Sequence, residues 1–113
     1  MLAFLQARLD AVGLRQVIGD KATFGKYDAG DPLHFLGRHA DHPYQGGTSS
    51  LLVYLGAPAS GGHTVFYEGP VGGDPEEVVV PAEGLAVIFD VYKPHEARAV
   101  EDGVKYIMGC ELK

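Results

Sequence analysis

The stretch SSLLVYLG, residues 49–56, decides the fold class of this chain. Its residues are too uniformly apolar for a strand with one solvent-facing side, and such runs are typical of strands covered on both faces. We therefore expect residues 49–56 to form a central strand. The chain has 16 glycines and seven prolines, which fall between short β-type runs rather than inside long helical ones. This pattern predicts an all-β sandwich or barrel.

Further β-type runs lie on both sides of this central stretch. We expect strands at 23–27, 33–41, 63–69, 78–81, 85–91, 92–100 and 104–112. The run at 85–91 is apolar enough that we expect it to be buried. Turns or loops are expected at 28–32, 57–62, 70–77 and, as a hairpin turn, at 101–103.

A helix is expected before the strands, over about residues 2–12. Leu2, Leu5, Leu9 and Val12 recur at helical spacing, and Gly13 follows as a plausible stop. The apolar stripe of this helix should face the core.

Length and composition limit the function classes. The 113 residues suit one domain, and 46% hydrophobic with 21% charged residues is ordinary for a globular protein. The net charge of −6 disfavours nucleic-acid and anionic-membrane partners. No apolar run reaches membrane-spanning length, and the sole cysteine, Cys110, cannot form an internal disulfide. We expect a cytoplasmic protein without nucleic-acid or membrane partners.

The sequence His39-Ala40-Asp41-His42 is the main candidate for chemistry. In an extended segment His39 and Asp41 point to the same face, so both can reach one metal ion. The third ligand could be a histidine elsewhere: the candidates are His34, His42, His63 and His95. Two histidines and one carboxylate form the facial triad of non-haem Fe(II) oxygenases. The alternative is a polar loop that is merely rich in histidine.

Five motifs occur in an order that resembles the prolyl 4-hydroxylase-like branch of the 2-oxoglutarate/Fe(II) dioxygenases. They are Tyr27-x-x-Gly30, His39-x-Asp41, Gly61-Gly62-His63-Thr64, His95 and Gly103-Val104-Lys105-Tyr106. The resemblance extends over most of residues 14–112. Each motif alone is weak, and their order carries the assignment.

The resemblance implies a mainly β, double-stranded β-helix (jelly-roll) fold with a short N-terminal helix. Residues 1–113 would be a single minimal dioxygenase domain, with its core at about 23–112. His39, Asp41 and His95 would hold Fe(II). Lys105, Tyr54 and Tyr27 would bind 2-oxoglutarate, with dioxygen as the second co-substrate and ascorbate as an optional further cofactor.

The implied activity is hydroxylation of an unactivated C–H bond, with release of succinate and carbon dioxide. The substrate would be a prolyl or another amino-acid side chain, in a peptide or a small molecule. The loops at 41–49 and 68–77 are expected to form the substrate rim. Arg38 could meet a substrate carboxylate or simply be solvated, and we expect it to be solvated.

The sequence departs from the family pattern at His63, where glutamate is usual, and at Gly109, where arginine often stands. The expected N-terminal layer is also short, which would expose apolar surface and favour a homo-oligomer. Two alternatives follow: a non-catalytic jelly-roll interaction module, and a cupin-like metal protein. A buried Lys105 beside the metal would favour the oxygenase over the cupin-like protein.

Overall fold

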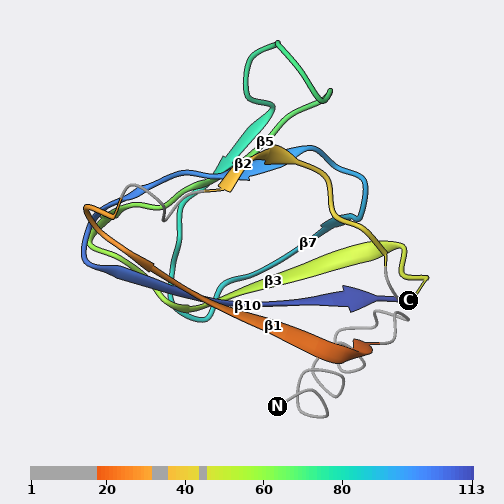
Figure 1. Ribbon diagram of the computed structural model, residues 1–113, viewed down its shortest axis with the longest axis horizontal. Coiled ribbons are helices and arrows are strands. Elements are labelled where there is room, and N and C mark those ends of the chain that lie inside the picture. The colour runs from red at the N-terminus through yellow and green to blue at the C-terminus, as the bar shows by residue number, and fades with distance from the viewer. Residues whose placement is uncertain (1–17, 32–35, 44–45) are drawn as a thin grey trace.

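The computed structural model describes residues 18–31, 36–43 and 46–113 (Figure 1). The helix expected at 2–12 lies outside these residues. Within them the chain forms only strands and loops, and no helix is long and apolar enough to cross a membrane. The strands are β1 (Ile18–Asp28), β2 (Leu36–His39), β3 (Ser49–Gly56), β4 (Ser60–Gly61), β5 (Thr64–Phe66), β6 (Glu77–Val79), β7 (Ala86–Asp90), β8 (His95–Ala97), β9 (Val100–Asp102) and β10 (Val104–Leu112).

These strands build two antiparallel four-stranded sheets that face each other (Figure 1). The major sheet has the order β1-β10-β3-β7, and the minor sheet has the order β2-β8-β5-β6. A short β4-β9 ladder lies beside them. The expectation of a mainly β sandwich is confirmed, and the two sheets are consistent with a double-stranded β-helix. The run 49–56 is a central strand, as expected, between β10 and β7.

The inner face of the major sheet carries the polar side chains that reach the minor sheet. Tyr54 Oη and Thr64 Oγ1 are 2.5 Å apart across the interior, and Lys105 Nζ donates to the Gly62 carbonyl at 3.0 Å. Since side chains alternate along a strand, the neighbours of Tyr54 and Lys105 point to the opposite, outer face.

That outer face carries a second apolar layer. Leu51, Val53, Met108 and Leu112 form a buried cluster, with Ala22 and Cys110 packed against it. The register explains the cluster, because Met108 lies opposite Val53 and Cys110 lies opposite Leu51. Burial raises the pKa of the Cys110 thiol, which keeps it protonated. Both faces of β3 and β10 are therefore covered around this cluster, which accounts for the apolar run in β3, while Leu55 and Tyr106 farther along the outer face are exposed.

The run at 85–91 differs from the prediction of a buried strand. β7 is an edge strand of the major sheet, and its residues alternate between exposed and half-buried. Ile88 lies on the outer face opposite Leu51 and is 37% exposed, whereas Phe89 faces the minor sheet. An edge strand has a neighbouring strand on only one side. The hydrophobicity of its own residues does not show whether it lies at the edge or in the centre of a sheet.

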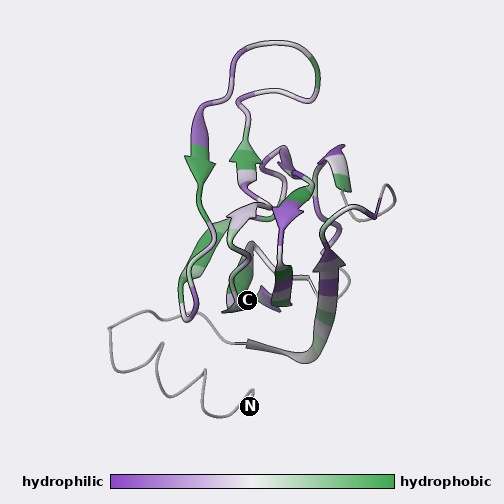
Figure 2. Ribbon diagram, turned by 90° about the vertical axis from the view of Figure 1, so that its left-hand side faces the viewer, coloured by the Kyte–Doolittle hydropathy of each residue, from purple (hydrophilic) through white to green (hydrophobic). Residues whose placement is uncertain are grey.

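The segment 92–100, expected to be one strand, contains β8 and only the first residue of β9, and β9 continues through residues 101–102 of the expected hairpin turn. β8 pairs with β2 and β5, and β9 pairs with β4. The expected loop 57–62 holds the short β4, and Gly103 makes the turn into β10 with a φ of 91°. Figure 2 shows hydrophobic residues interspersed along the strands, while the loop between β5 and β6 projects from the sandwich.

Candidate metal centre

The centre is built on the ladder between β2 and β8. His39 and His95 are register partners, so their side chains leave the minor sheet next to each other and their ring centroids lie 4.3 Å apart. Asp41 follows β2 by two residues and is held toward the major sheet, because its N–H donates to the Val91 carbonyl at 3.0 Å. The chain thus delivers a carboxylate between the two sheets, beside two imidazoles.

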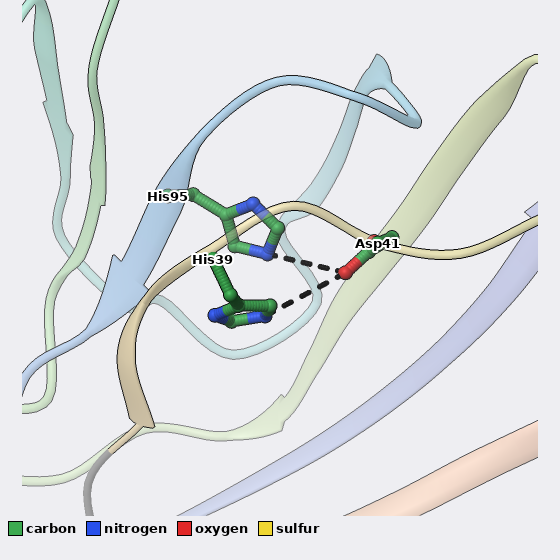
Figure 3. A group of neighbouring side chains, drawn as sticks. All are labelled: His39, Asp41 and His95. Carbon is green, nitrogen blue, oxygen red and sulfur yellow. Dashed lines mark ion pairs between the residues drawn. The ribbon is translucent and has the colours of Figure 1, made fainter. Parts of the chain in front are cut away.

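The three side chains converge on one point (Figure 3). Asp41 Oδ1 lies 3.6 Å from His39 Nε2 and 3.5 Å from His95 Nε2. All three atoms lie within 4.8 Å of one another, and among the described residues this is the one such group of histidine, cysteine or carboxylate side chains. Two nitrogens and one oxygen on one side of a point are the donor set of a facial triad.

Both imidazoles are oriented in the same way. His39 Nδ1 lies 2.7 Å from the Gly37 carbonyl, and His95 Nδ1 lies 2.8 Å from the Lys93 carbonyl. A carbonyl can only accept, so Nδ1 carries the hydrogen and Nε2 keeps the lone pair that a metal needs. Each histidine is therefore held by the backbone two residues before it.

Asp41 is oriented from the major sheet. Ser50 Oγ donates to Asp41 Oδ2 at 2.5 Å, and this leaves Oδ1 directed at the two histidines. Ser50 is buried at the start of β3. Ser50 was not among the predicted site residues, because a lone serine in a strand gives no signal for such a role.

His95 is the most deeply buried member of the triad. Its ring packs against Phe89 at 4.8 Å and against Phe66 at 5.9 Å between centroids. Burial lowers the pKa of His95, although the hydrogen bond to the Lys93 carbonyl and the charge of Asp41 act in the opposite direction. The lowered pKa favours the neutral imidazole, which is the form that coordinates metal.

A pocket of about 70 Å³ adjoins the triad, and both triad histidines and Lys105 belong to its lining. Lys105 is only 1% exposed, and its ammonium lies 4.5 Å from the centre of the Tyr27 ring. The two residues are register partners in the ladder of β1 and β10. Burial lowers the pKa of Lys105 from 10.5 to about 8. An incoming carboxylate would raise the pKa of Lys105 again and stabilise its charged form.

Tyr54 lies behind this pocket rather than in its lining. It is fully buried, its pKa is raised by burial, and its hydroxyl meets Thr64 Oγ1. Thr64 itself lines the pocket, together with His39, His95 and Lys105. Thr64 is therefore a pocket residue absent from the predicted site, although it ends the Gly61-Gly62-His63-Thr64 motif that could have identified it.

The remaining candidates lie elsewhere. His42 is exposed and His63 is half-buried, and neither belongs to the cluster, while His34 lies outside the described residues. Arg38 is half-buried rather than fully solvated: its guanidinium lies over the Tyr67 ring, 3.3 Å from the centroid, and donates to the Gly72 carbonyl at 2.7 Å. It ties the loop after β5 to the strand that carries His39.

Structural comparison finds similar architectures. A Burkholderia pseudomallei oxidoreductase of the 2OG-Fe(II) oxygenase family aligns with a TM-score of 0.71 and 22% identity, over 94% of this chain and 50% of that protein. A Pseudomonas putida prolyl-4-hydroxylase aligns with a TM-score of 0.66 and 26% identity, over 96% of this chain and 61% of that protein.

A viral collagen prolyl hydroxylase from Paramecium bursaria Chlorella virus-1, in complex with 2-oxoglutarate, aligns at 20% identity with a TM-score of 0.56. That alignment covers 97% of this chain and 66% of the viral protein. The chain thus spans about half to two thirds of the length of these proteins. No functionally curated protein matches the sequence significantly.

The family model of the 2OG-Fe(II) oxygenase superfamily matches residues 22–110. This region contains the triad, the pocket and most of both sheets. The match covers most of the chain, and the chain therefore belongs to the 2OG-Fe(II) oxygenase superfamily.

Proposed function

We propose that this protein is an Fe(II)- and 2-oxoglutarate-dependent dioxygenase that hydroxylates a C–H bond. The observation that carries the proposal is the placement of a buried ammonium beside a triad of ligand atoms. Ligand atoms of His39, Asp41 and His95 lie within 4.8 Å of one another, and Lys105 lines the pocket next to them. Family membership supports the same activity.

The donor set fits Fe(II). Imidazole nitrogens suit iron, and a carboxylate adds a negative charge that offsets part of the charge of the ion. Three protein ligands on one side leave further positions for a co-substrate and dioxygen. Bound iron and 2-oxoglutarate would supply the oxidising power that converts C–H and O₂ to C–OH, with 2-oxoglutarate going to succinate and carbon dioxide.

The residues of the pocket fit 2-oxoglutarate. We assign Lys105 to its distal carboxylate, because an ammonium in a low-dielectric pocket pairs strongly with an anion. The hydroxyl of Thr64 and the ring of Tyr27 line the same pocket. Tyr54 would act on the pocket through Thr64, because the hydroxyl groups of these two residues are hydrogen-bonded to each other. It is a positioning residue in this proposal.

For the substrate we propose a prolyl residue or another amino-acid side chain of a peptide. The support is the similarity to the Pseudomonas putida prolyl-4-hydroxylase and to the viral collagen prolyl hydroxylase. Loop 68–76 is a candidate rim, since it follows β5 closely and is fixed by Arg38 to the strand of His39.

The test is an anaerobic titration with Fe(II) and then 2-oxoglutarate, followed by visible absorption of the chelate. We expect a charge-transfer band in the wild type and none in Asp41→Ala, because a triad without its carboxylate holds iron poorly. Lys105→Ala should bind iron but need far more 2-oxoglutarate for the same band.

Each of the other possible results of this titration would indicate a different kind of protein. Iron binding with no response to 2-oxoglutarate would match a cupin-like metal protein. A folded wild type that binds neither would match a non-catalytic interaction module. Iron binding that survives in Asp41→Ala would show that the His39–Asp41 segment is a polar loop and would end the proposal.

A further inference from the structure

A second cavity lies between the edge strands of the two sheets. β6 ends the minor sheet and β7 ends the major sheet, and a cleft of about 230 Å³ opens between them. It is separate from the pocket of Lys105, because the described residues that line one cavity do not line the other. The proposed reaction makes no use of this cleft.

The floor of the cleft is apolar and rests against the metal centre. Phe66 and Phe89 pack edge to face with centroids 4.9 Å apart, and Val87 lines the same floor. The two aromatic rings also contact His95, which does not line the cleft. A group in the cleft is thus separated from a triad histidine by one layer of aromatic side chains.

The rim of the cleft is acidic. Register pairing runs across the minor sheet from His39 to His95, then to Phe66 and then to Glu77, so these side chains share one face. Glu77 is exposed at the end of this row, and Asp90 is exposed on the opposite edge strand.

The cation of the lining, Lys93, is already paired. Its Nζ lies 2.7 Å from Oε2 of Glu76, a residue outside the cleft lining. One oxygen of Asp90 accepts the Tyr92 N–H at 2.8 Å. The cleft lining therefore holds two carboxylates, Glu77 and Asp90, against one already paired ammonium, in a chain with a net charge of −6. Such a field favours a cationic ligand.

We propose that this cleft binds a lysine or arginine side chain of a peptide. The aliphatic stem would lie on Val87 and the two phenylalanines, and the cationic head would lie at the rim beside Glu77, with Asp90 adding a second negative charge at the end of β7. Long basic side chains bury their stems on apolar surface while the charge stays at the rim, and aromatic faces attract cations. The volume is below that of sites for whole small molecules, which run from about 300 Å³ upward.

This inference deepens the proposed function and rests on it for its biological role. A peptide held here lies close to His95, so the cleft would select substrates with a basic residue a few positions from the hydroxylated one. The binding itself needs neither iron nor turnover and can be measured without them.

The experiment is an NMR titration of the full chain, following the backbone amides of Phe66, Glu77 and Phe89. The probe is acetyl-Ser-Gly-Ser-Lys-Ser-Gly-Ser-amide, with glutamine, norleucine or glutamate in place of lysine as comparison peptides. We expect the lysine peptide to shift these amides and to bind about fivefold more tightly than the norleucine peptide, with weaker binding still for glutamate.

Variants then locate the site. Glu77→Gln should lower the affinity for the lysine peptide about threefold to fivefold, and Val87→Phe should block the cleft. Glu83→Gln removes an exposed carboxylate outside the cleft lining and should change nothing. If Val87→Phe does not fold, Glu77→Gln alone decides the matter, because an exposed edge residue is not needed for folding.

The proposal is overturned if lysine and norleucine peptides bind equally, or if Glu83→Gln weakens binding as much as Glu77→Gln. The first result would mean apolar contact only, and the second would mean diffuse attraction to an acidic protein. Neither result affects the iron and 2-oxoglutarate titration. Conversely, lysine-specific binding in a protein that fails that titration would leave the cleft as a peptide site without hydroxylation.

Discussion

His39 and His95 lie directly opposite each other in the β2–β8 ladder. The Nδ1–H of each ring donates a hydrogen bond to the backbone carbonyl two residues before it. This repeated local arrangement orients both Nε2 atoms toward Asp41 Oδ1. The backbone of two strands therefore sets the geometry of the triad before any ion binds. Asp41 depends instead on a side chain of the other sheet, Ser50.

Ser50→Ala is expected to weaken metal binding without abolishing it. The variant frees Asp41 Oδ2, so the carboxylate can rotate away from the histidines, and loss of such a partner typically costs about tenfold to a hundredfold in metal affinity. Competition of the protein with a chromogenic chelator for Co(II) measures the effect. Ser60→Ala, at an exposed position of β4, is the matched control. Equal affinities in wild type and Ser50→Ala would refute this role.

The stability of the metal-free protein should rise between pH 8 and pH 10.5 because of Lys105. The pKa of this lysine is about 8 in the fold and 10.5 in the reference state, so in that interval the unfolded chain binds more protons than the folded chain. Under proton linkage, the free energy of unfolding then increases with pH. The gain is complete above the unfolded pKa and is lost as the pH falls through 8.

Lys105→Met removes this titration and keeps an unbranched side chain. Urea unfolding of both proteins at two pH values, near 7.5 and near 10, isolates the contribution of Lys105, since other groups titrate in both proteins. The wild type should gain about 2 kcal/mol relative to Lys105→Met at the higher pH. A constant difference between the two proteins would mean that Lys105 is not desolvated as its burial implies.

Binding of 2-oxoglutarate should take up a proton at about pH 8.5. Part of the Lys105 population is neutral there, and a carboxylate beside it raises its pKa again. Anaerobic calorimetry of the iron-loaded protein in two buffers of different ionisation enthalpy measures this uptake. Lys105→Arg keeps the charge without a titration in this range and should show no buffer dependence. The same heats in both buffers for the wild type would place the co-substrate away from Lys105.

Gly62→Ala should destabilise the protein and disturb the pocket of Lys105. Gly62 has a φ of +72°, and a Cβ there would lie 3.1 Å from Val100 Cγ2 and 3.3 Å from Lys105 Cδ. Backbone strain and crowding together should cost about 2 to 3 kcal/mol. Thermal unfolding measures the loss, and weaker 2-oxoglutarate binding should accompany it.

Gly84→Ala separates the two contributions. Gly84 has a φ of +84°, and no atom lies within 4 Å of the position that an alanine methyl group would take, so only backbone strain remains, at about 1 kcal/mol. This variant should leave 2-oxoglutarate binding unchanged. If both alanine variants lose the same stability and the same affinity, the contact between Gly62 and Lys105 has no effect.

Short-range patterns in the sequence determined several features of this protein. The apolar runs at 49–56 and 104–112 correspond to β3 and β10, whereas the hairpin turn expected at 101–103 is reduced to a bend at Gly103, because residues 101–102 belong to β9 and β9 pairs with β4 rather than with β10. The one-residue spacing of His39 and Asp41 was also visible. These features depend on neighbours along the chain. Alternation of side chains, turn propensity and burial on both faces can each be recognised from the residue types within a few positions.

The tertiary structure alone decided which distant residues meet. His95 joins His39 through the register of β2 and β8, Ser50 reaches Asp41 from the other sheet, and Thr64 rather than Tyr54 lines the pocket. β7 became an edge strand and helped to form the cleft at Phe89. The physical reason is that strand order and strand register are set by packing over the whole domain. The residues of one strand do not specify which distant strand will pair with it.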